Sequence, residues 1–246
     1  MTTAWRSIHN VVDLISGMCQ QFIQFPPRNQ HNRVAQKFRQ KFNFPGVIGC
    51  VDGTHIPVLV PKDDVAETYR NRKGFMSLNV QMVCGPNSEI YDITANWPGS
   101  AHDAAIWTSC DLNGKLSSGM ASIEHHLLGD SAYPLKEFLL TPYKNPSNSS
   151  QVRYNKRHSS TRMAIEKAYG QLKRRFPLLK NGLKFRKIAD SANCVVVAVC
   201  LYNFCKAHQD TFEEKKNFHA EEVLETENYP ADIRGSAKRD RIVNYL

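Results

Sequence analysis

The sequence predicts an α/β fold in which a mixed sheet is flanked by helices and preceded by a short helical region. Residues 47–95 hold short apolar runs and an alternating apolar–polar segment, both typical of β-strands. Residues 8–19 and 161–176 repeat apolar side chains every three or four positions, as amphipathic helices do. The 246-residue chain is 41% hydrophobic, which is enough for a buried core and excludes global disorder.

The helical N-terminal region is expected over residues 1–44. A first helix covers the apolar repeat at 8–19, and Pro26-Pro27 ends it because proline cannot continue the backbone hydrogen bonding of a helix. A second, shorter helix is expected over 32–42. After this region the apolar pattern changes from helical spacing to short strands.

The predicted sheet begins at Val47, where short apolar segments follow one another along the chain. The turn sequence Gly85-Pro86-Asn87-Ser88 separates two of these segments, which are therefore expected to pair as an antiparallel hairpin. A further short strand precedes Asp130. The expected strands cover 47–51, 56–60, 78–83, 90–95 and 127–128.

Further helices are expected in the second half of the chain. Apolar residues from Ile165 to Phe176 form one stripe, and Pro177 ends the helix that carries it. The valine-rich segment 192–204 fits either a helix or a strand, and we prefer a helix. Another helix is expected to start near Asp103.

Polar segments limit the predicted central domain to residues 45–208. Residues 141–160 contain two prolines and a polar run, and we expect them to form a surface loop. Residues 209–246 are rich in charged side chains and are expected to form a weakly ordered, polar C-terminal tail.

Positive charge is concentrated in one stretch of the chain. Residues 153–187 carry a net charge of +11 and contain a single acid, Glu166, whereas the rest of the chain carries −2. Such a concentration is typical of proteins that bind a polyanion. A solvated helix face is the alternative, and the presence of one suspected metal ligand among these cations makes it the weaker interpretation.

The cysteines and histidines do not predict a zinc site. The seven cysteines include no C-x-x-C pair, and no His-x-x-x-His spacing surrounds His55 or His102, which we expect to be polar core residues. The unpaired cysteines indicate a reduced, intracellular protein. Four cysteines lie in apolar runs and are expected to be buried: Cys50, Cys84, Cys194 and Cys200.

No membrane segment is expected from the sequence. The longest apolar run, 194–202, is far shorter than the roughly 20 residues that span a bilayer. The N-terminus shows no basic region followed by an apolar core, so no signal peptide is predicted. We therefore expect a soluble protein.

Acidic residues at four positions form the predicted site: Asp52, Asp103, Asp130 and Glu166. Two carboxylates about 4 Å apart repel by roughly 4 kcal/mol at an effective dielectric of 20, so a cation would be needed to bring them together. Mg²⁺ prefers oxygen ligands, and two such ions can serve phosphodiester cleavage. A strand, the end of its neighbour and a helix across them would present Asp52, Asp130 and Glu166 to such ions.

Basic residues follow Glu166 on the same predicted helix. Lys173 lies seven residues on, two turns along the same face, where it could hold a phosphate beside the ions. Arg174 and Arg175 extend the basic surface and are expected to add sequence-independent, salt-dependent affinity for DNA.

Each acid also has a structural explanation that the sequence leaves open. Asp52 and Asp130 could each begin a turn, and Asp103 could cap the helix that follows it. Glu166 could form an exposed ion pair with Arg162, four residues earlier on the helix. The order of the four acids, rather than any one of them, favours a metal site.

Six segments of the chain resemble the PIF/Harbinger superfamily of DDE transposases, especially the domesticated, Harbinger transposase-derived nucleases of animals. The resemblance extends from about residue 5 to residue 208, and its motifs occur in the same order as in the family. The segments are Val51–Ile56, Tyr69–Gly74, Asn79–Gln81, Asn96–Asp103, Leu128–Tyr133 and Ile165–Gly170.

The resemblance implies a ribonuclease-H-like nuclease domain over 45–208 that depends on Mg²⁺ or Mn²⁺. By position in the motifs, Asp52 and Asp130 match the two catalytic aspartates of the family and Glu166 matches its catalytic glutamate. Asp103 matches a further acidic position of the metal site. The resemblance therefore assigns all four acids to metal binding and three of them to catalysis.

The resemblance also implies location and partners. Family members act on DNA, are typically nuclear and often depend on a Myb-like protein for DNA targeting. We therefore expect a nuclear protein here, with the cytoplasm as the alternative. They usually begin with a longer region resembling a helix-turn-helix, so residues 1–44 are expected to be a truncated form of it. A transposase-derived endonuclease is our leading hypothesis, and an inactive domesticated DNA- or protein-binding factor is the alternative.

Overall fold

A computed structural model describes residues 3–60, 65–210, 229 and 232–246 of the chain. The helices are α1 (Thr3–Gly17), α2 (His31–Phe42), α3 (Asp103–Ser109), α4 (Asp111–Ser117), α5 (Ser149–Arg175), α6 (Leu178–Asn181), α7 (Ile188–Ala207) and α8 (Ile233–Val243). Short 3-10 helices are η1 (Cys19–Gln21), η2 (Arg28–Gln30) and η3 (Ala66–Tyr69). The strands are β1 (Val47–Pro57), β2 (Ser77–Cys84), β3 (Ile90–Pro98), β4 (His126–Leu128) and β5 (Leu139–Leu140).

The five strands form one mixed sheet in the order β3-β2-β1-β4-β5. Strands β1, β2 and β3 pair with one another in antiparallel fashion, and the turn after Cys84 joins β2 to β3 as the sequence predicts. Strand β4 is parallel to β1, and β5 is parallel to β4. The predicted ribonuclease-H-like α/β fold is confirmed, with β1 at the centre of the sheet.

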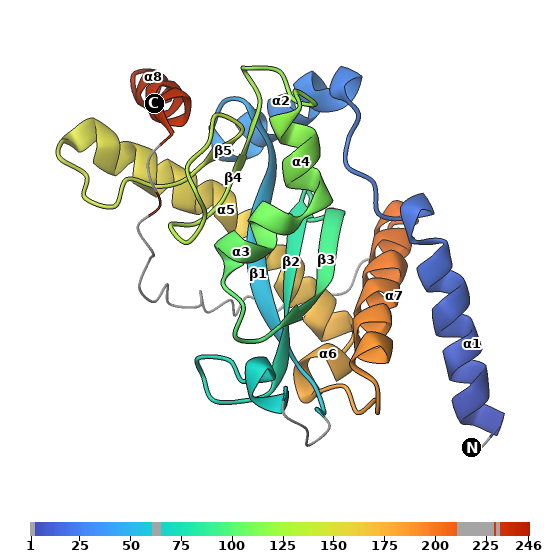
Figure 1. The fold of residues 1–246 in the computed structure, drawn as a ribbon. Coiled ribbons are helices and arrows are strands. Elements are labelled where there is room, and N and C mark those ends of the chain that lie inside the picture. The colour runs from blue at the N-terminus through green and yellow to red at the C-terminus, as the bar shows by residue number, and fades with distance from the viewer. Residues whose placement is uncertain (1–2, 61–64, 211–228, 230–231) are drawn as a thin grey trace.

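Helices cover both faces of the sheet (Figure 1). Helices α5 and α7 lie behind the sheet in this view, where α5 packs against β1 and β2 and α7 packs against β3. Helices α3 and α4 lie in front of it, and α1 packs along α7 at the side. This arrangement places the middle of α5 directly across the centre of β1.

Strand β1 is longer than the sequence predicts. Two separate strands were expected on either side of Asp52, but β1 runs without a break from Val47 to Pro57. Asp52 pairs with Met82 and Gly53 with Gln81 of β2, so cross-strand pairing holds this stretch extended. The turn interpretation of Asp52 is therefore wrong, and its carboxylate is presented from the middle of a central strand.

Helix α5 begins at Ser149, so the prediction of a surface loop over 141–160 is wrong for its second half. The side chain of Asn148 caps the helix by accepting a hydrogen bond from the Gln151 N–H at 2.9 Å. Tyr154 and His158 are buried one turn apart, on the face turned toward the core. This burial provides the packing that the polar local sequence does not predict.

The C-terminal segment also differs from the expected weakly ordered tail. Helix α8 packs against β5 and α5, and Ile242 and Val243 are buried. Lys238 is buried as well, and its Nζ donates to the carbonyls of His125 and Glu137 at 2.8 Å each. Residues 211–228 and 230–231 of the predicted tail lie outside the described part of the chain.

Helix α7 confirms the helical interpretation of 192–204. Among the described residues it is the one helix that is long and apolar enough to cross a membrane. Half of its apolar stretch is buried inside the protein. It packs against α1, α5 and β3. A core helix of this kind meets the same criterion, so α7 is weak evidence for a membrane span.

The cysteines behave as the sequence predicts, with one difference. All seven are free, and Cys50, Cys84 and Cys200 are buried. Cys194 is only half-buried.

Candidate active site

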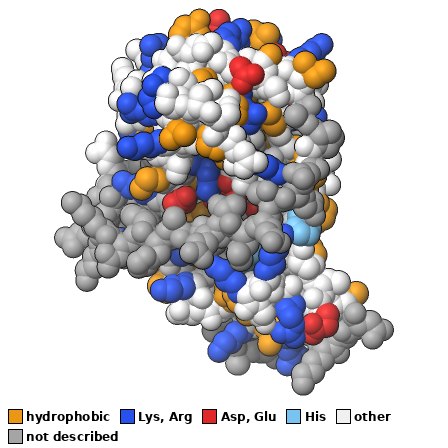
Figure 2. All heavy atoms as spheres, turned by 90° about the vertical axis from the view of Figure 1, so that its left-hand side faces the viewer, with side chains coloured by type: hydrophobic (Ala, Val, Ile, Leu, Met, Phe, Trp, Pro, Cys, Tyr) orange, Lys and Arg blue, Asp and Glu red, His pale blue; other side chains and the backbone are white. Residues whose placement is uncertain are grey.

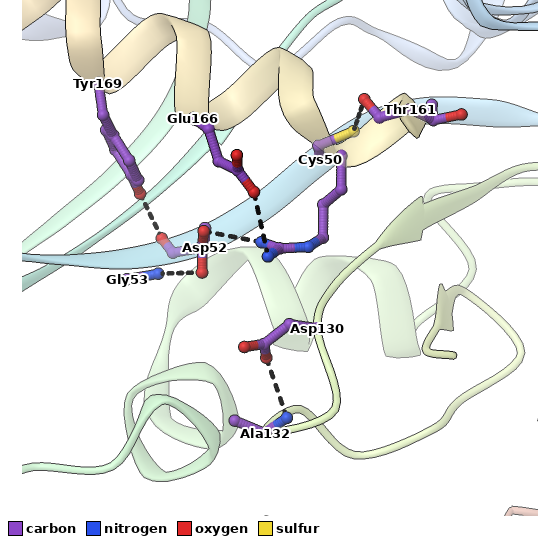
Figure 3. Close-up of polar contacts among 9 residues, drawn as sticks. Cys50, Asp52, Gly53, Asp130, Ala132, Thr161, Glu166 and Tyr169 are labelled. Atoms are coloured by element: carbon purple, nitrogen blue, oxygen red, sulfur yellow. Dashed lines mark hydrogen bonds and ion pairs between the residues drawn. The ribbon is translucent and has the colours of Figure 1, made fainter. Parts of the chain in front are cut away.

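Three of the predicted acids, Asp52, Asp130 and Glu166, lie near one another in Figure 3, and the charge of the fourth, Asp103, acts on Asp52. Cys50 of β1 pairs with Leu128, the last residue of the parallel strand β4, so Asp52 in β1 and Asp130 just beyond β4 each lie two residues after this pair. Glu166 projects toward them from α5 in Figure 3. Asp103 comes from the first residue of α3. The predicted spacing in sequence therefore becomes proximity in the fold.

Asp52 is held by hydrogen bonds on both oxygens. Its Oδ1 accepts from the Gly53 N–H at 3.0 Å, and its Oδ2 accepts from Arg162 Nη1 at 2.7 Å. The hydroxyl of Tyr169 on α5 donates to the Asp52 carbonyl and ties the helix to the strand. The pKa of Asp52 is raised to about 8. Burial is the largest cause of this rise, Arg162 opposes it, and the charge of nearby Asp130 adds to it.

Asp103 is positioned by an asparagine and a glycine. Asn79 Nδ2 on β2 donates to Asp103 Oδ1 and to the Ala101 carbonyl, at 2.9 Å each. A Cβ on Gly53 would lie 2.4 Å from Asp103 Oδ1, so only glycine leaves room for this carboxylate. The residue at the N-cap position of α3 is His102, and Asp103 follows it, so Asp103 is not the cap. Burial raises the pKa of the Asp103 carboxyl.

Arg162 joins two of the acids. The ion pair between Arg162 and Glu166 is present, with Nη2 3.5 Å from Oε1, but it is largely buried rather than exposed as expected. The same guanidinium contacts Asp52 through Nη1. Burial alone would lower the pKa of Arg162, but Asp52, Asp130 and Glu166 together raise it. Arg162 is therefore the cation around which these acids gather.

Asp130 lies just after β4 and makes a local turn. Its Oδ1 accepts from the Ala132 N–H at 2.9 Å, which agrees with the turn interpretation of this residue. The turn does not remove Asp130 from the site, because its charge raises the pKa of both Asp52 and Asp103. The structural and functional interpretations of Asp130 are compatible.

The oxygen-only chemistry of this set suits a hard divalent cation such as Mg²⁺ or Mn²⁺. Because Gly53 has no side chain, the Asp103 carboxylate can lie close against strand β1. Within the described ranges, no three His, Cys, Asp or Glu side chains lie close enough to hold one ion together. Ion binding by these residues thus requires Asp52 and Glu166 to turn from Arg162 toward a point that the other acids can also reach.

The three predicted DNA-binding cations do not share one surface. Lys173 Nζ lies beside β1 and donates to Thr54 Oγ1 at 2.6 Å and to the His55 carbonyl at 3.2 Å. Arg175 pairs instead with the Asp210 carboxylate. Residues two apart on a helix point about 200° away from each other, which explains the separation. Arg174, between them, is half-buried.

Several residues that shape the site were not assigned a role from sequence. Tyr133 and Tyr169 are buried beside the acids, and among the described residues the Tyr133 hydroxyl has no hydrogen-bond partner. Asn79, Gly53 and Tyr133 all occur within the motifs that carry the family resemblance, which was the one available signal.

The two histidines near the motifs are not core residues. His55 is half-buried, with Nδ1 3.1 Å from Ser77 Oγ. His102 is exposed, and its Nδ1 lies 2.6 Å from Arg72 Nη2. The expectation that they are polar core residues is therefore wrong for His102 and only partly met by His55.

The face of the molecule seen in Figure 2 combines both charges. Acidic side chains are recessed near its middle, and Lys and Arg side chains lie above and below them. A recessed acidic centre with a basic surround is the charge distribution expected for a metal site that receives a polyanion.

Comparison with known proteins identifies the family. Residues 51–203 match the model of the DDE superfamily endonucleases, a segment that contains Asp52, Asp103, Asp130 and Glu166. The chain belongs to the DDE endonuclease superfamily. This membership covers more than half of the chain and includes every acid of the candidate site.

The relatives of this DDE superfamily member agree with the PIF/Harbinger resemblance. It is 33% identical over 209 residues to the human protein named "Putative nuclease HARBI1", covering 82% of this chain and 58% of the relative. The cattle (Bos taurus) protein of the same name shows the same identity and coverage. "Protein ALP1-like" of Arabidopsis thaliana is 28% identical over 184 residues, covering 69% of this chain and 45% of the relative. No solved structure matches the chain.

The chain spans a little over half the length of these nuclease relatives. What the whole relatives do can therefore reach this chain only as a proposal.

Proposed function

We propose that this DDE superfamily member is a divalent-metal-dependent endonuclease that cleaves DNA phosphodiester bonds. Asp52, Asp130 and Glu166 are the catalytic acids, and Asp103 is a further metal ligand. The observation that carries the proposal is the register of β1 and β4, which sets Asp52 and Asp130 side by side opposite Glu166. Two bound ions would activate the attacking oxygen and stabilise the leaving oxygen of an in-line displacement.

The residues of this chain prepare the site in three ways. Asn79 and Gly53 hold Asp103 at the edge of the acid set through a hydrogen bond and an open space. Tyr169 fixes α5 against β1, so that Glu166 stays opposite Asp52. Buried aromatic side chains such as Tyr133 limit water around the carboxylates, which strengthens their attraction for cations.

DNA is the proposed substrate because of the charge that surrounds the acids. The basic segment 153–187 includes most of α5, the helix that carries Glu166. Lys173 lies on the same side of α5 as Glu166 and is proposed to contact a phosphate near the cleaved bond. Arg174 and Arg175 are proposed to add affinity that decreases as the salt concentration rises.

Plasmid nicking tests this function directly. The purified protein with Mg²⁺ or Mn²⁺ is expected to nick supercoiled DNA, and Asp130→Ala is expected to abolish nicking. Asp111→Asn, an acid at the start of α4 outside the site, serves as the matched control and should nick normally. Nicking by Asp130→Ala at the wild-type rate would show that the active site has been placed wrongly.

The same samples separate the alternatives. DNA binding in EDTA that is unaffected by Asp52→Ala, without cleavage in any metal, would favour a domesticated binding factor. Parallel assays on duplex DNA, RNA and a small phosphoester would distinguish a DNA nuclease from a ribonuclease or a phosphatase on the same fold.

We also propose a nuclear location, with the cytoplasm as the alternative, and a Myb-like partner that directs the protein to DNA. The resemblance of the sequence motifs to the PIF/Harbinger family motivates both proposals. Imaging of the tagged protein and co-purification with and without nuclease treatment would test them. Exclusion from the nucleus would contradict the first proposal.

A further inference from the structure

We propose that Arg162 is a built-in counter-cation that competes with divalent ions for Asp52 and Glu166 and thereby sets the ion concentration at which the site fills. The inference rests on the proposed function in one respect only, namely that these acids bind divalent ions. It assigns Arg162 a role as a positioning residue that acts through the carboxylates.

The first argument is the geometry of the guanidinium. Nη1 of Arg162 lies 2.7 Å from Asp52 Oδ2, and Nη2 lies 3.5 Å from Glu166 Oε1. One planar group therefore bridges an acid of the central strand and an acid of the helix across it. The side chains are 12%, 16% and 24% exposed for Arg162, Asp52 and Glu166, so little water screens the bridge.

The second argument is the identity of the oxygens. Asp52 Oδ1 already accepts a hydrogen bond from the Gly53 N–H, so Oδ2 is the oxygen better placed to face an ion shared with Glu166. Oδ2 is the oxygen that Arg162 uses. A divalent ion bound by Asp52 Oδ2 and Glu166 Oε1 would repel the guanidinium strongly, because both cations would lie within a few ångströms of the same oxygens. The ion and the guanidinium thus compete for the same two oxygens.

The third argument is the balance of charge. The guanidinium of Arg162 faces Asp52 and Glu166 directly, and the charge of Asp130 also acts on it. Asp103 adds a further negative charge next to Asp52. One positive charge cannot neutralise these acids once they are ionised, so the ionised site still attracts cations while Arg162 reduces that attraction. A purely structural ion pair would need only one of the acids.

The fourth argument is that the backbone around Arg162 is held in place. Cys50 Sγ donates to the Thr161 carbonyl at 3.6 Å, and Tyr169 bonds to the Asp52 carbonyl, so α5 is tied to β1 on both sides of Arg162. Displacement of the guanidinium therefore requires rotation of a long side chain and not movement of the helix.

Mn²⁺ titration of three variants tests the proposal. Calorimetric titration at pH 8.5 compares the wild type with Arg162→Gln, Arg162→Lys and the control Arg157→Gln, which changes an exposed arginine of the same helix. Arg162→Gln is expected to bind Mn²⁺ about tenfold more tightly, because no cation has to be displaced. Arg162→Lys keeps the charge and should stay within about threefold of the wild type, as should Arg157→Gln.

Two further measurements do not depend on cleavage. In EDTA, the unfolding temperature of Arg162→Gln should fall by several degrees, and saturating Mn²⁺ should raise it more than it raises that of the wild type. In ¹⁵N spectra, the side-chain signal that disappears in Arg162→Gln should shift when Mg²⁺ is added to the wild type. A purely structural arginine would weaken metal binding when replaced and would not respond to Mg²⁺.

The outcomes separate this inference from the proposed function. Unchanged or weaker Mn²⁺ binding by Arg162→Gln, while the wild type binds Mn²⁺, overturns the competition and leaves the metal site standing. Equal tightening by Arg162→Lys also overturns it, because charge would not be the cause. If Arg162→Gln does not fold, Arg162→Lys and the Mg²⁺ response of the Arg162 signal decide the matter. No Mn²⁺ binding by the wild type overturns both proposals.

Discussion

The acidic site and a cluster of buried basic side chains solve the same electrostatic problem in opposite ways. The basic cluster comprises His31, His125, His126, His158 and Lys238, all buried, where α2, β4, α5 and α8 meet. In both regions, burial shifts the pKa of each group in the direction that favours its neutral form. Burial raises the pKa of Asp52 to about 8, and it lowers that of His158 to about 4 and that of Lys238 to about 7.

The difference between the two regions lies in what holds the groups. In the basic cluster, no opposite charge bridges the groups: His31 bonds to the Pro26 carbonyl at 2.8 Å and His158 to that of Leu140 at 3.2 Å, and among the described residues the ring nitrogens of His126 have no hydrogen-bond partner. An imidazole can remain neutral at physiological pH and act as an ordinary core group. In the acidic site, the carboxylates meet a cation, Arg162. The basic cluster is therefore a structural feature, whereas the acidic site retains charge that a fold alone does not require.

Replacement of Glu166 is expected to produce the largest effect. Glu166→Gln should lower the cleavage rate about 1,000-fold, because the amide cannot replace a negatively charged metal ligand. The free energy of unfolding should change by less than about 1 kcal/mol, since the contact with Arg162 is long, at 3.5 Å, and Arg162 keeps its shorter contact with Asp52. Single-turnover cleavage and urea unfolding measure the two quantities. A large loss of stability with normal cleavage would show that Glu166 serves the fold, as the basic cluster does, and not catalysis.

Acidification should reduce the stability that the basic cluster contributes, whereas the raised pKa of Asp52 shifts stability in the opposite direction. The folded-state pKa of His158 is about 4, below the unfolded value of 6.5, so the unfolded chain binds more protons between these values. The contribution of His158 to stability is complete above pH 6.5 and is lost as the pH falls toward 4, by about 3 kcal/mol.

Urea unfolding across pH 4–7 checks this expectation. His158→Gln, which keeps a donor for the Leu140 carbonyl, should lose much of the pH dependence. His208→Gln, an exposed histidine after α7, should keep it. The prediction fails if the wild type and His158→Gln lose stability in parallel.

A methyl group on Gly53 should disturb the acidic site with little effect elsewhere. The added Cβ of Gly53→Ala would meet Asp103 Oδ1 at 2.4 Å, so the carboxylate has to move away from Asn79. We expect cleavage to fall about tenfold. Gly114→Ala is the control: nothing lies within 4 Å of its Cβ, and a helical alanine should raise stability by about 0.5–1 kcal/mol. Equal rates for both variants would remove Asp103 from the site.

The smallest expected effect concerns the two sides of α5. Lys173→Gln should lower the slope of DNA affinity against salt by about one, as for the loss of one phosphate contact. Arg175→Gln should change the slope less, because Arg175 pairs with Asp210 on another side of the helix. Binding of labelled duplex DNA at several salt concentrations measures both slopes. Equal changes would show that DNA contacts both sides of α5.

Much of this fold is predictable from local pattern, and the exceptions share a cause. The hairpin of β2 and β3 and the apolar half of α5 follow from alternation and helical spacing. The first three turns of α5 and the whole of α8 do not, because their sequences are polar and only burial against other elements stabilises them. Strand β1 continues through Asp52-Gly53 because β2 pairs with it, which no local preference indicates.

The sequence by itself determined which acids form the candidate site, the order in which they occur and the basic stretch around the last of them. These properties depend on residue identity and spacing, which can be read without coordinates. Only the tertiary structure decided that Arg162 lies between Asp52 and Glu166, that Asn79 and Gly53 position Asp103, and that Lys173 and Arg175 face different surroundings. The physical reason is that each of these contacts joins segments far apart in the chain, or depends on which face of a helix the rest of the protein covers.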